Sequence, residues 1–201
     1  MKGKTIVITG VSSFVGANLA IKYANEKFNV IGIISKSANS YLNTRKKRLK
    51  LCEEKGVNLY QLNLLDNKSI KYFFKEFKID YFIHHAAWVE DANSANFNLK
   101  KALDVNILPL RTLYEELSNS SARGIVITGT NAEYGDKNIG CKESDLCMPT
   151  TPYGLSKLSM TLTSYQLFNE FKVPTRIARI FNPLGALDNP KKLLPSIIHQ
   201  I

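Results

Sequence analysis

The chain has 201 residues, and a hydrophobic fraction of 44% with 22% charged residues is ordinary for one globular domain. Its apolar segments fall short of the roughly 20 residues that cross a bilayer, and no secretory signal pattern is recognised. We therefore expect a cytoplasmic protein without a membrane partner. The three cysteines show neither CxxC spacing nor neighbouring histidines, so we expect neither disulfides nor a metal site.

The formal net charge of +10 makes nucleic acid a partner to consider. The basic residues are dispersed, however, except for a run from Arg45 to Lys50, and aromatic residues do not interleave with them. We interpret this run as a solvated helix face and expect no nucleic-acid partner. A positive surface also attracts small, doubly charged molecules such as nucleotide diphosphates.

The first element lies within the stretch from Thr5 to Gly16, TIVITGVSSFVG. Ile6 to Ile8 predict a short strand buried on both faces, Gly10 permits a tight turn, and a helix is expected from Phe14 to about Lys27. Unpaired amides at such a helix start favour a pyrophosphate. An ordinary strand-turn-helix connection remains an equal alternative from this pattern alone.

A second apolar strand, Val30 to Ile34, completes a βαβ unit. The residues just past this strand meet the adenosine ribose in dinucleotide-binding units, where a carboxylate favours NAD. Here the positions hold Ser35, Lys36 and Ser37, which favour NADP. A polar strand end that binds no ligand is the alternative.

The next predicted elements are a helix from Tyr41 to Lys55 that ends at Gly56, a strand from Val57 to Leu62, and a helix from Asn67 to Lys78. A fourth strand, Tyr81 to His84, follows.

This fourth strand leads into His84-His85-Ala86-Ala87. Small residues at a strand's carboxyl end let a flat ligand lie close. Neighbouring strand residues point to opposite faces, so the two histidines are unsuited to share a metal. We favour structural or cofactor-adjacent roles for them over a catalytic pair.

The second half of the chain is predicted to contain a helix at Asn98 to Ser118 with a kink at Pro109, a strand at Ile125 to Thr128, a functional loop at Gly135 to Thr151, a helix at Tyr153 to about Phe171, a strand at Thr175 to Ile180, and the start of a helix from Lys191. This alternation predicts an α/β fold: a doubly wound parallel sheet in the order 3-2-1-4-5-6 with helices on both faces. Its ligand crevice lies at the carboxyl ends of the strands.

Tyr153 and Lys157 stand one helical turn apart and project from the same face. A neighbouring ammonium and the positive helix end stabilise a phenolate, so we expect the pKa of Tyr153 to be lowered toward the working range. The pair could then exchange a proton with a substrate oxygen held by Thr130. The alternative is an exposed pair without function, which the YxxxK spacing alone favours.

Six motifs in order make a more specific pattern: TGVSSFVG at Thr9 to Gly16, HHAA at His84 to Ala87, Asn106 in LDVN, Thr130 and Tyr134-Gly135 in GTNAEYG, YGLSK at Tyr153 to Lys157, and RIFNPLG at Arg179 to Gly185. Together they resemble the extended short-chain dehydrogenase/reductase family, also called the NAD-dependent epimerase/dehydratase family. The resemblance covers essentially the whole chain and implies an NAD(P)-binding Rossmann fold.

The resemblance also implies roles for single residues. Tyr153 would be the general acid/base, and Lys157 would lower its pKa and hold the nicotinamide ribose. Thr130 would orient the reacting oxygen, and Asn106 would support the lysine side of the cofactor site. Asn182 would contact the diphosphate of a nucleotide-activated sugar, the family's usual substrate.

The remaining implied contacts are with the cofactor, NADP or NAD. They are the first turn at the pyrophosphate (Gly10, Ser13, Phe14, Val15 and Gly16), the ribose end (Ser35 and Lys36), the adenine side (Asn63 and Leu64), and the small pair Ala86 and Ala87. The resemblance further implies a homodimer paired through the two long helices and a place in polysaccharide biosynthesis.

Three departures from the family pattern matter. Ser13 replaces the usual middle glycine, and its hydroxyl could cap the helix or bond a phosphate. Sugar 4,6-dehydratases carry an acidic pair after the threonine, whereas this chain has Asn131 and Ala132, with Glu133 expected to face elsewhere. Dehydration is therefore disfavoured. The chain is also about a hundred residues shorter than usual, so we expect a dinucleotide-binding domain at 1–190 and the start of a missing or truncated substrate lobe at 191–201.

These features favour an NAD(P)-dependent enzyme that acts on a nucleotide-activated sugar, with a 4-keto-sugar reductase preferred over an epimerase. The alternative is a truncated, non-catalytic protein that binds or senses NAD(P).

Overall fold

The structure, a computed structural model, describes residues 3–92, 94, 96–136 and 140–198. Its centre is a sheet of six parallel strands: β1 (Thr5–Thr9), β2 (Asn29–Ile34), β3 (Asn58–Gln61), β4 (Tyr81–His84), β5 (Ile125–Thr130) and β6 (Thr175–Ile180). The strand order is β3-β2-β1-β4-β5-β6, which confirms the predicted doubly wound topology.

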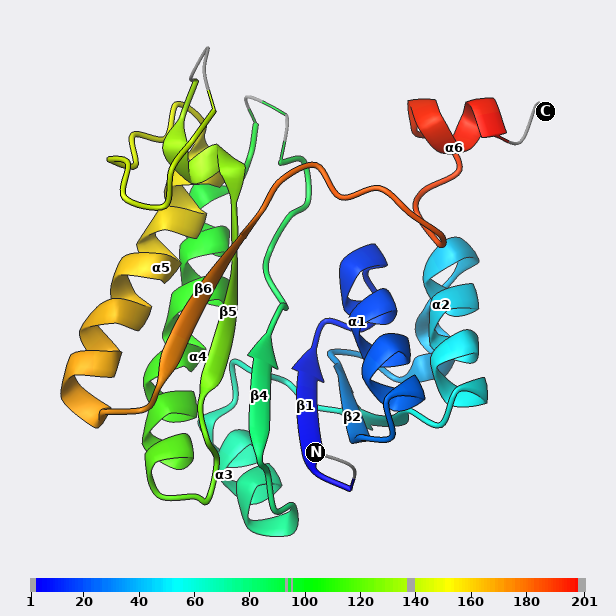
Figure 1. Ribbon diagram of the computed structural model, residues 1–201, viewed down its shortest axis with the longest axis vertical. Helices are drawn as coiled ribbons and strands as arrows, with labels where there is room; N and C mark the ends of the chain where they lie inside the picture. Colours follow the sequence, from blue (N-terminus) through cyan, green and yellow to red (C-terminus); the bar gives the residue numbers. More distant parts are fainter. Residues whose placement is uncertain (1–2, 93, 95, 137–139, 199–201) are drawn as a thin grey trace.

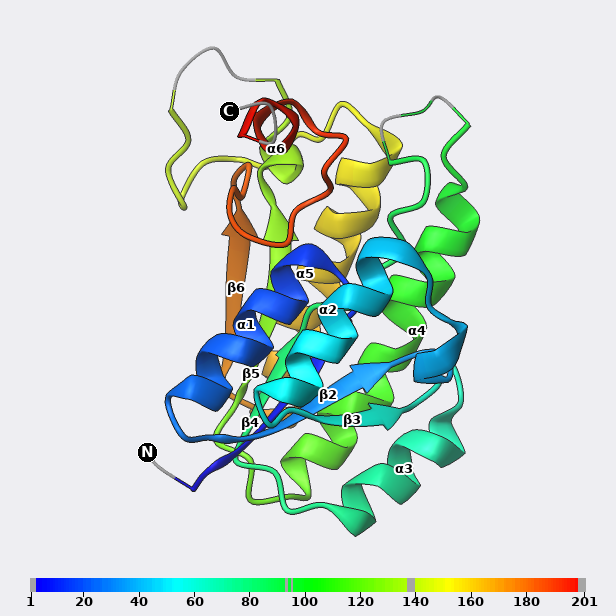
Figure 2. The same ribbon diagram turned by 90° about the vertical axis from the view of Figure 1, so that its right-hand side faces the viewer.

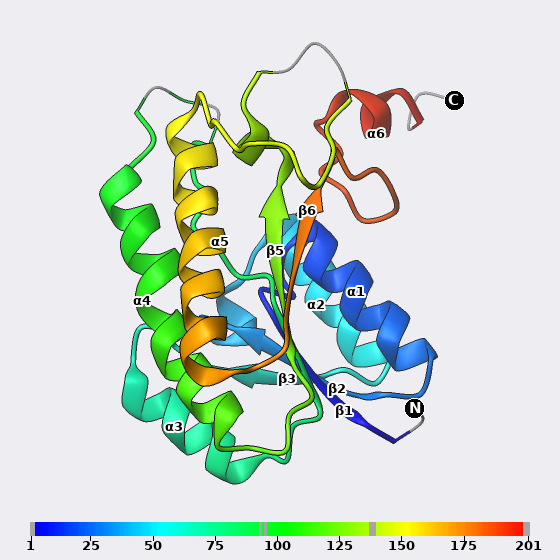
Figure 3. The ribbon, with the colours of Figure 1, turned by 60° about the vertical axis from the view of Figure 1, so that its left-hand side comes forward.

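Helices cover both faces of this sheet. The helices α1 (Phe14–Asn25) and α2 (Asn43–Glu54) lie on one face, and α3 (Asn67–Glu76), α4 (Leu99–Ser118) and α5 (Pro152–Phe171) lie on the other (Figures 1 and 3). After β6 the chain crosses to the α1–α2 side and ends in a short helix, α6 (Leu193–Ile198), beyond the carboxyl ends of the strands (Figure 2). No helix of the described segments is long and apolar enough to cross a membrane.

Alternation along the strands divides the core into two layers. Val7 of β1 packs with the residues of α3, α4 and α5, while its neighbours Ile6 and Ile8 pack with α1 and α2. Continuous apolar runs are what a parallel strand needs when both of its faces are buried. This explains why the sequences of the central strands consist largely of consecutive hydrophobic residues.

Side-chain caps fix where the helices begin. The Ser13 side chain accepts a hydrogen bond from the Gly16 amide at the start of α1, and Asp66 caps α3 through the Lys68 amide. Pro152 occupies the first turn of α5, where its missing N–H costs nothing.

The predicted boundaries hold to within a few residues, with two instructive differences. β5 extends two residues beyond the predicted end because Gly129 and Thr130 pair with Arg179 and Ile180 of β6. The helix expected from Tyr41 begins instead at Asn43 as α2.

Candidate functional site

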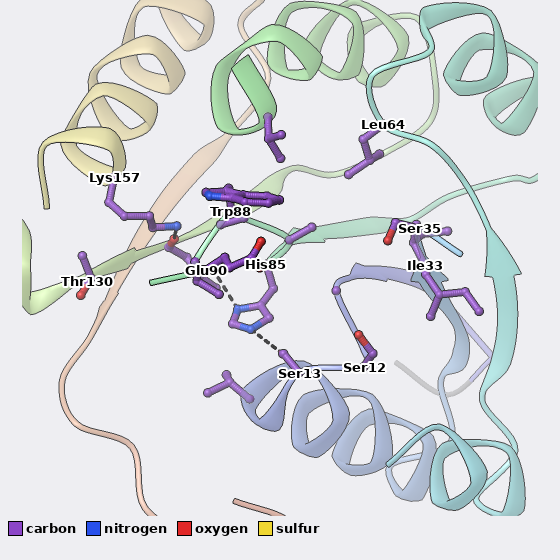
Figure 4. Close-up of a pocket in the computed structure, with 18 of the residues that line it drawn as sticks. Ser12, Ser13, Ile33, Ser35, Leu64, His85, Trp88, Glu90, Thr130 and Lys157 are labelled. Carbon is purple, nitrogen blue, oxygen red and sulfur yellow. Dashed lines mark hydrogen bonds between the residues drawn. The ribbon is translucent and has the colours of Figure 1, made fainter. Parts of the chain in front are cut away.

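A cavity of about 1030 Å³ lies at the carboxyl ends of the strands. Figure 4 shows Lys157 and Thr130 at one end, Ser35 and Leu64 at the other, and Trp88 and His85 between them. The polar ends of parallel strands converge at this edge, as the topology requires. The cavity is large enough for a dinucleotide to lie along it.

The first turn forms one wall of the cavity. Gly10 has φ of +75°, and a β-carbon there would come within 3.0 Å of the Ala86 backbone, so this position needs glycine. A β-carbon at Gly16 would lie 2.4 Å from the Gly10 carbonyl oxygen, so the helix start and the turn are in direct contact. Gly10, Ser13 and Val15 line the cavity, so the turn and the start of α1 form part of its wall.

The opposite end is polar and basic. Ser35 and Lys36 both line the cavity, as do Tyr41 and Arg45. The Ser35 amide donates to the Tyr41 hydroxyl (3.2 Å), which holds the turn after β2 against the segment before α2. Among the described residues, two cationic side chains line this wall, and Glu90, whose carboxylate also lines the cavity, lies nearer to His85 (Figure 4).

Three residues with acid-base or hydroxyl chemistry line the far end: Thr130, Tyr153 and Lys157. The Lys157 Nζ donates to the Thr128 carbonyl oxygen at 2.6 Å, and burial lowers the pKa of Lys157 to about 8. Burial also raises the pKa of Tyr153, although a hydrogen bond with Thr130 lowers it. The expectation that Lys157 lowers the pKa of Tyr153 is therefore not met, because the amine is directed to the backbone of β5.

A buried carboxylate supports this end from behind. Glu133 is fully buried; its Oε1 accepts from the Thr130 amide (2.9 Å), and its Oε2 accepts from the Thr161 hydroxyl (3.0 Å) and the Arg179 Nε (2.8 Å). It joins the end of β5 to α5 and β6 and does not line the cavity. Its negative charge also raises the pKa of Lys157, opposing the effect of burial.

The two histidines occupy opposite sides of their strand end. The His84 Nδ1 lies 3.3 Å from the Thr9 hydroxyl, and His84 is buried. His85 lines the cavity and lies between two hydroxyls, those of Ser13 and Thr128. Burial, with help from the charge on Lys157, lowers the pKa of His84 to about 3 and of His85 to about 4, so both are neutral at neutral pH.

Most of the residues implied by the sequence resemblance lie along this cavity: Gly10, Ser13, Val15, Ser35, Lys36, Asn63, Leu64, Ala86, Ala87, Thr130, Tyr153, Lys157 and Asn182. Three do not line it. The amide of Gly16 is taken by the Ser13 cap, and the Asn106 side-chain oxygen accepts from the Trp88 amide (2.8 Å). The Phe14 ring instead lies near Lys192 and Gly185. Any contribution of these three to binding is indirect in this structure.

Several lining residues were not anticipated from the sequence. Trp88 forms the middle of the cavity wall, with the Lys101 Nζ 4.0 Å from its ring centroid. Arg45 and Lys192 are further cations along the wall. Their side chains reach the cavity from helices or loops, so strand-end patterns could not identify them.

The basic run on α2 is only partly a solvated face. Arg45, Lys46, Lys47 and Lys50 are exposed, but Arg48 is buried. Its guanidinium donates to the Leu187 carbonyl (2.9 Å) and to the Ser12 carbonyl (3.2 Å). This residue corrects the expectation for the run, because it fastens the segment after β6 to the first turn.

Comparison with known proteins supplies an independent measure. The sequence model of the NAD dependent epimerase/dehydratase family matches residues 6–201. The chain is 29% identical to dTDP-D-glucose 4,6-dehydratase of Dictyostelium discoideum, over 98% of this chain and 48% of that protein. It is 27% identical to UDP-glucose 4-epimerase of Neisseria meningitidis serogroup A, over 96% of this chain and 60% of that protein.

Solved structures show the same fold. UDP-glucuronic acid 4-epimerase of Bacillus cereus, in complex with UDP-glucuronic acid and NAD, superposes with a TM-score of 0.82 at 22% identity, over 98% of this chain and 62% of that chain. The dTDP-glucose 4,6-dehydratase of Bacillus anthracis in complex with NAD gives a TM-score of 0.79 at 20% identity. The chain thus spans about half to three fifths of the length of these relatives.

Proposed function

The chain belongs to the NAD-dependent epimerase/dehydratase family, and we propose that it binds NADP or NAD and transfers hydride at a carbon of a nucleotide-activated sugar. The single observation that carries this proposal is the cavity, which joins the glycine turn at Gly10 to Thr130, Tyr153 and Lys157. When bound, the nicotinamide group supplies or accepts the hydride. All other steps depend on the chain's own residues.

Tyr153 is the proposed acid/base, because it lines the cavity and its hydroxyl forms a hydrogen bond with the Thr130 side chain. Thr130 holds the reacting oxygen, and Glu133 holds Thr130 through its backbone amide. Lys157 stays largely protonated at neutral pH, since its lowered pKa still lies at about 8. Its ammonium donates to the Thr128 carbonyl oxygen and can donate a further proton to a ribose hydroxyl of the cofactor.

The side chains after Thr130 argue against dehydration. Asn131 and Ala132 carry no carboxyl group, and the Glu133 carboxylate is fully buried and paired with Arg179. Water elimination needs an acid and a base at the sugar ring. We therefore propose reduction of a 4-keto sugar, or epimerisation, even though one similar relative is named as a dehydratase.

The basic end of the cavity supports a preference for NADP. Lys36 and Arg45 line it together with Ser35, and the strand end lacks the carboxylate that binds a free 2′-hydroxyl. A 2′-phosphate adds two negative charges at this position, which two cations complement. NADPH is the reductant that a stoichiometric reductase consumes, so the two proposals support each other.

The experiment separates binding from turnover. Trp88 is the only tryptophan of the chain and lines the cavity, so its fluorescence reports cofactor binding directly. We expect quenching by NADPH, and NADPH consumption with a nucleotide-linked 4-keto-6-deoxy sugar when the chain is assayed with any sequence that follows Ile201 in its reading frame. Failure of both NADPH and NADH to quench Trp88 would overturn the proposed cofactor site. Binding without NADPH consumption on any such sugar would overturn the reductase.

A non-catalytic NAD(P)-binding or sensing protein is the second candidate, favoured by the Lys157 ammonium, which bonds to the Thr128 carbonyl oxygen, and by the raised pKa of Tyr153. The Tyr153 and Lys157 pair counts against it. Tyr153→Phe distinguishes the two, because it removes the acid/base hydroxyl and leaves the cavity shape intact. Loss of turnover with intact Trp88 quenching supports the enzyme, whereas Trp88 quenching without turnover in both the wild type and Tyr153→Phe supports the sensor.

We also propose that the protein forms a homodimer, and that the chain divides into a dinucleotide-binding domain at 1–190 and the start of a substrate lobe at 191–201. Leu108 on α4 and Leu162 and Tyr165 on α5 are exposed by 62%, 59% and 66%. Exposed apolar side chains on these two neighbouring helices favour pairing with a second copy. The mass in solution, measured by light scattering, tests the dimer.

A further inference from the structure

The imidazole of His85 bridges the first turn and the sheet. Its Nε2 lies 2.9 Å from the Ser13 hydroxyl, and its Nδ1 lies 3.0 Å from the Thr128 hydroxyl (Figure 4). Ser13 is the residue that replaces the family's usual middle glycine. The serine that departs from the pattern is therefore held by a histidine on the neighbouring strand end.

Hydrogen-bond counting assigns the direction of each bond. A neutral imidazole has one donor and one acceptor, so one hydroxyl donates to it and the other accepts. Thr128 Oγ1 also lies 3.4 Å from the His84 carbonyl oxygen, which can only accept. The arrangement that satisfies every group has Ser13 donating to Nε2, Nδ1–H donating to Thr128, and Thr128 donating to the His84 carbonyl.

The opposite arrangement also satisfies the ring. In it Nε2–H donates to Ser13 Oγ, and Thr128 rotates its proton to Nδ1, giving up the long 3.4 Å bond. The imidazole keeps one proton, which moves from Nδ1 to Nε2 by exchange with water, and both hydroxyls keep theirs. The Ser13 proton is then free to point into the cavity that Ser13 lines.

We propose that His85 is a positioning residue that changes tautomer when a pyrophosphate binds, and so turns Ser13 into a hydrogen-bond donor to that phosphate. The inference rests on the proposed function, because it requires a dinucleotide at the first turn. A phosphate oxygen is an ionised acceptor and binds a hydroxyl proton more strongly than a neutral imidazole does. Meanwhile Ser13 continues to accept from the Gly16 amide, so the cap of α1 is kept in both arrangements.

His84 provides a built-in reference. Thr9 Oγ1 accepts from the amides of His85 (2.9 Å) and Ala86 (2.8 Å), so its own proton is available to His84 Nδ1. His84 therefore carries its proton on Nε2, the atom that is buried without a hydrogen-bond partner among the described residues. Neither Thr9 nor His84 lines the cavity, so we expect the tautomer of His84 to stay the same on binding.

The test is the tautomer of each histidine, read from ¹⁵N NMR of the imidazole nitrogens in the full chain. His85→Gln assigns the His85 signals by their loss. We expect the Nδ1–H form of His85 in the free protein and the Nε2–H form with NADPH, and we expect the same change with ADP but not with adenosine, which lacks phosphate. His84 stays in the Nε2–H form throughout.

Two variants test whether the tautomer change of His85 depends on the hydroxyls of Ser13 and Thr128. Ser13→Ala removes the hydroxyl that would donate to the phosphate. We expect NADPH still to quench Trp88, with an affinity about 10-fold lower, and the tautomer of His85 no longer to change on binding. Thr128→Val leaves Nδ1 without an oxygen partner, so His85 adopts the Nε2–H form before any ligand is added. Should Ser13→Ala fail to fold, Thr128→Val tests the same relay from its other end.

The possible results distinguish failure of the proposed cofactor site from failure of the proposed tautomer change at His85. If wild-type Trp88 is quenched but His85 keeps one tautomer with and without NADPH, this inference is overturned and the cofactor site stands. A change with adenosine as large as with ADP would also overturn it, since the phosphate would not be the cause. If no dinucleotide quenches Trp88, both the site and the inference fall.

Discussion

The ammonium of Lys157 is fastened to the Thr128 carbonyl oxygen by a hydrogen bond of 2.6 Å. Lys157 is buried, with an exposed fraction of 3%. The bond joins α5 to the end of β5 at the point where the cavity wall carries Thr130. A charged amine held in this way is costly to bury, and the cost appears as a pKa lowered to about 8.

This lowered pKa predicts how stability depends on pH. The unfolded chain binds a proton at Lys157 up to its ordinary pKa of 10.5, whereas the folded chain loses it near 8. Between these values the unfolded state binds more protons, so the contribution of Lys157 to stability rises with pH. We therefore expect the free energy of unfolding of the wild type to rise relative to that of Lys157→Met from pH 8 to pH 10.

Urea unfolding at several pH values measures this gap. Lys100→Met removes a lysine that is 89% exposed and serves as the matched control for the loss of one charge. A gap for Lys157→Met that stays constant from pH 7 to pH 10 would show that Lys157 titrates in the folded chain as it does in the unfolded one.

The Glu133 carboxylate is predicted to stabilise the end of the cavity that Thr130, Tyr153 and Lys157 line. Glu133→Gln removes the charge opposite Arg179, which is itself only 19% exposed, and weakens the acceptor for Thr161 and the Thr130 amide. We expect a loss of unfolding free energy on the order of 3 kcal/mol, because a partly buried cation is left without its partner. Chemical denaturation measures it.

A double variant separates the ion pair from the packing. In Glu133→Gln with Arg179→Met no uncompensated cation remains, so the double variant should be more stable than Glu133→Gln alone. Equal or lower stability of the double variant would mean that Glu133 acts through its backbone and hydroxyl contacts rather than through Arg179.

Arg45 is predicted to discriminate between the two cofactors. It lines the ribose end of the cavity beside Lys36, so Arg45→Ala removes one of two cations that can meet a 2′-phosphate. We expect about a 10-fold loss of NADPH affinity, in line with a charged hydrogen bond, and little change for NADH. Titration of Trp88 fluorescence with each cofactor gives the ratio; equal losses for both would place Arg45 outside the 2′-phosphate contact.

The sequence predicted the order of the strands and the strand-end residues well, because both follow from local patterns. Apolar runs define buried strands, and the carboxyl ends of parallel strands must meet at one edge. What it could not predict were contacts between distant segments. The buried roles of Arg48 and Glu133 depend on which carbonyl or cation faces them in space, and Arg48 sits in a run of exposed cations that looks uniform along the chain.

The sequence-based expectation that the pKa of Tyr153 is lowered is wrong for a related reason. Helical spacing brings Tyr153 and Lys157 to one face, and from this we expected the lysine to lower the pKa of the tyrosine. The direction of the Lys157 side chain depends instead on the Thr128 carbonyl, which belongs to another element. Burial then dominates at Tyr153 and raises its pKa.

Arg48 carries the last prediction, which concerns the segment after β6. Its guanidinium donates to the carbonyls of Leu187 and Ser12, and the Asn18 side chain donates to the Ala186 carbonyl (2.9 Å). In Arg48→Met the segment keeps only the Asn18 contact of these, so it should open more often. We expect a loss of about 2 kcal/mol in the local opening free energy, because the segment loses its charge-assisted hydrogen bond from Arg48 to the Leu187 carbonyl.

Hydrogen exchange of peptides that cover residues 183–192 measures this opening, and the predicted loss corresponds to exchange faster by more than 10-fold. Lys47→Met, which removes an exposed cation from the same helix, is the matched control. Because Asn182, Pro183 and Lys192 line the cavity, the loosened segment should also raise the dissociation constant for NADPH measured at Trp88. Faster exchange with unchanged NADPH binding would mean that the segment after β6 contributes to stability but not to the cofactor site.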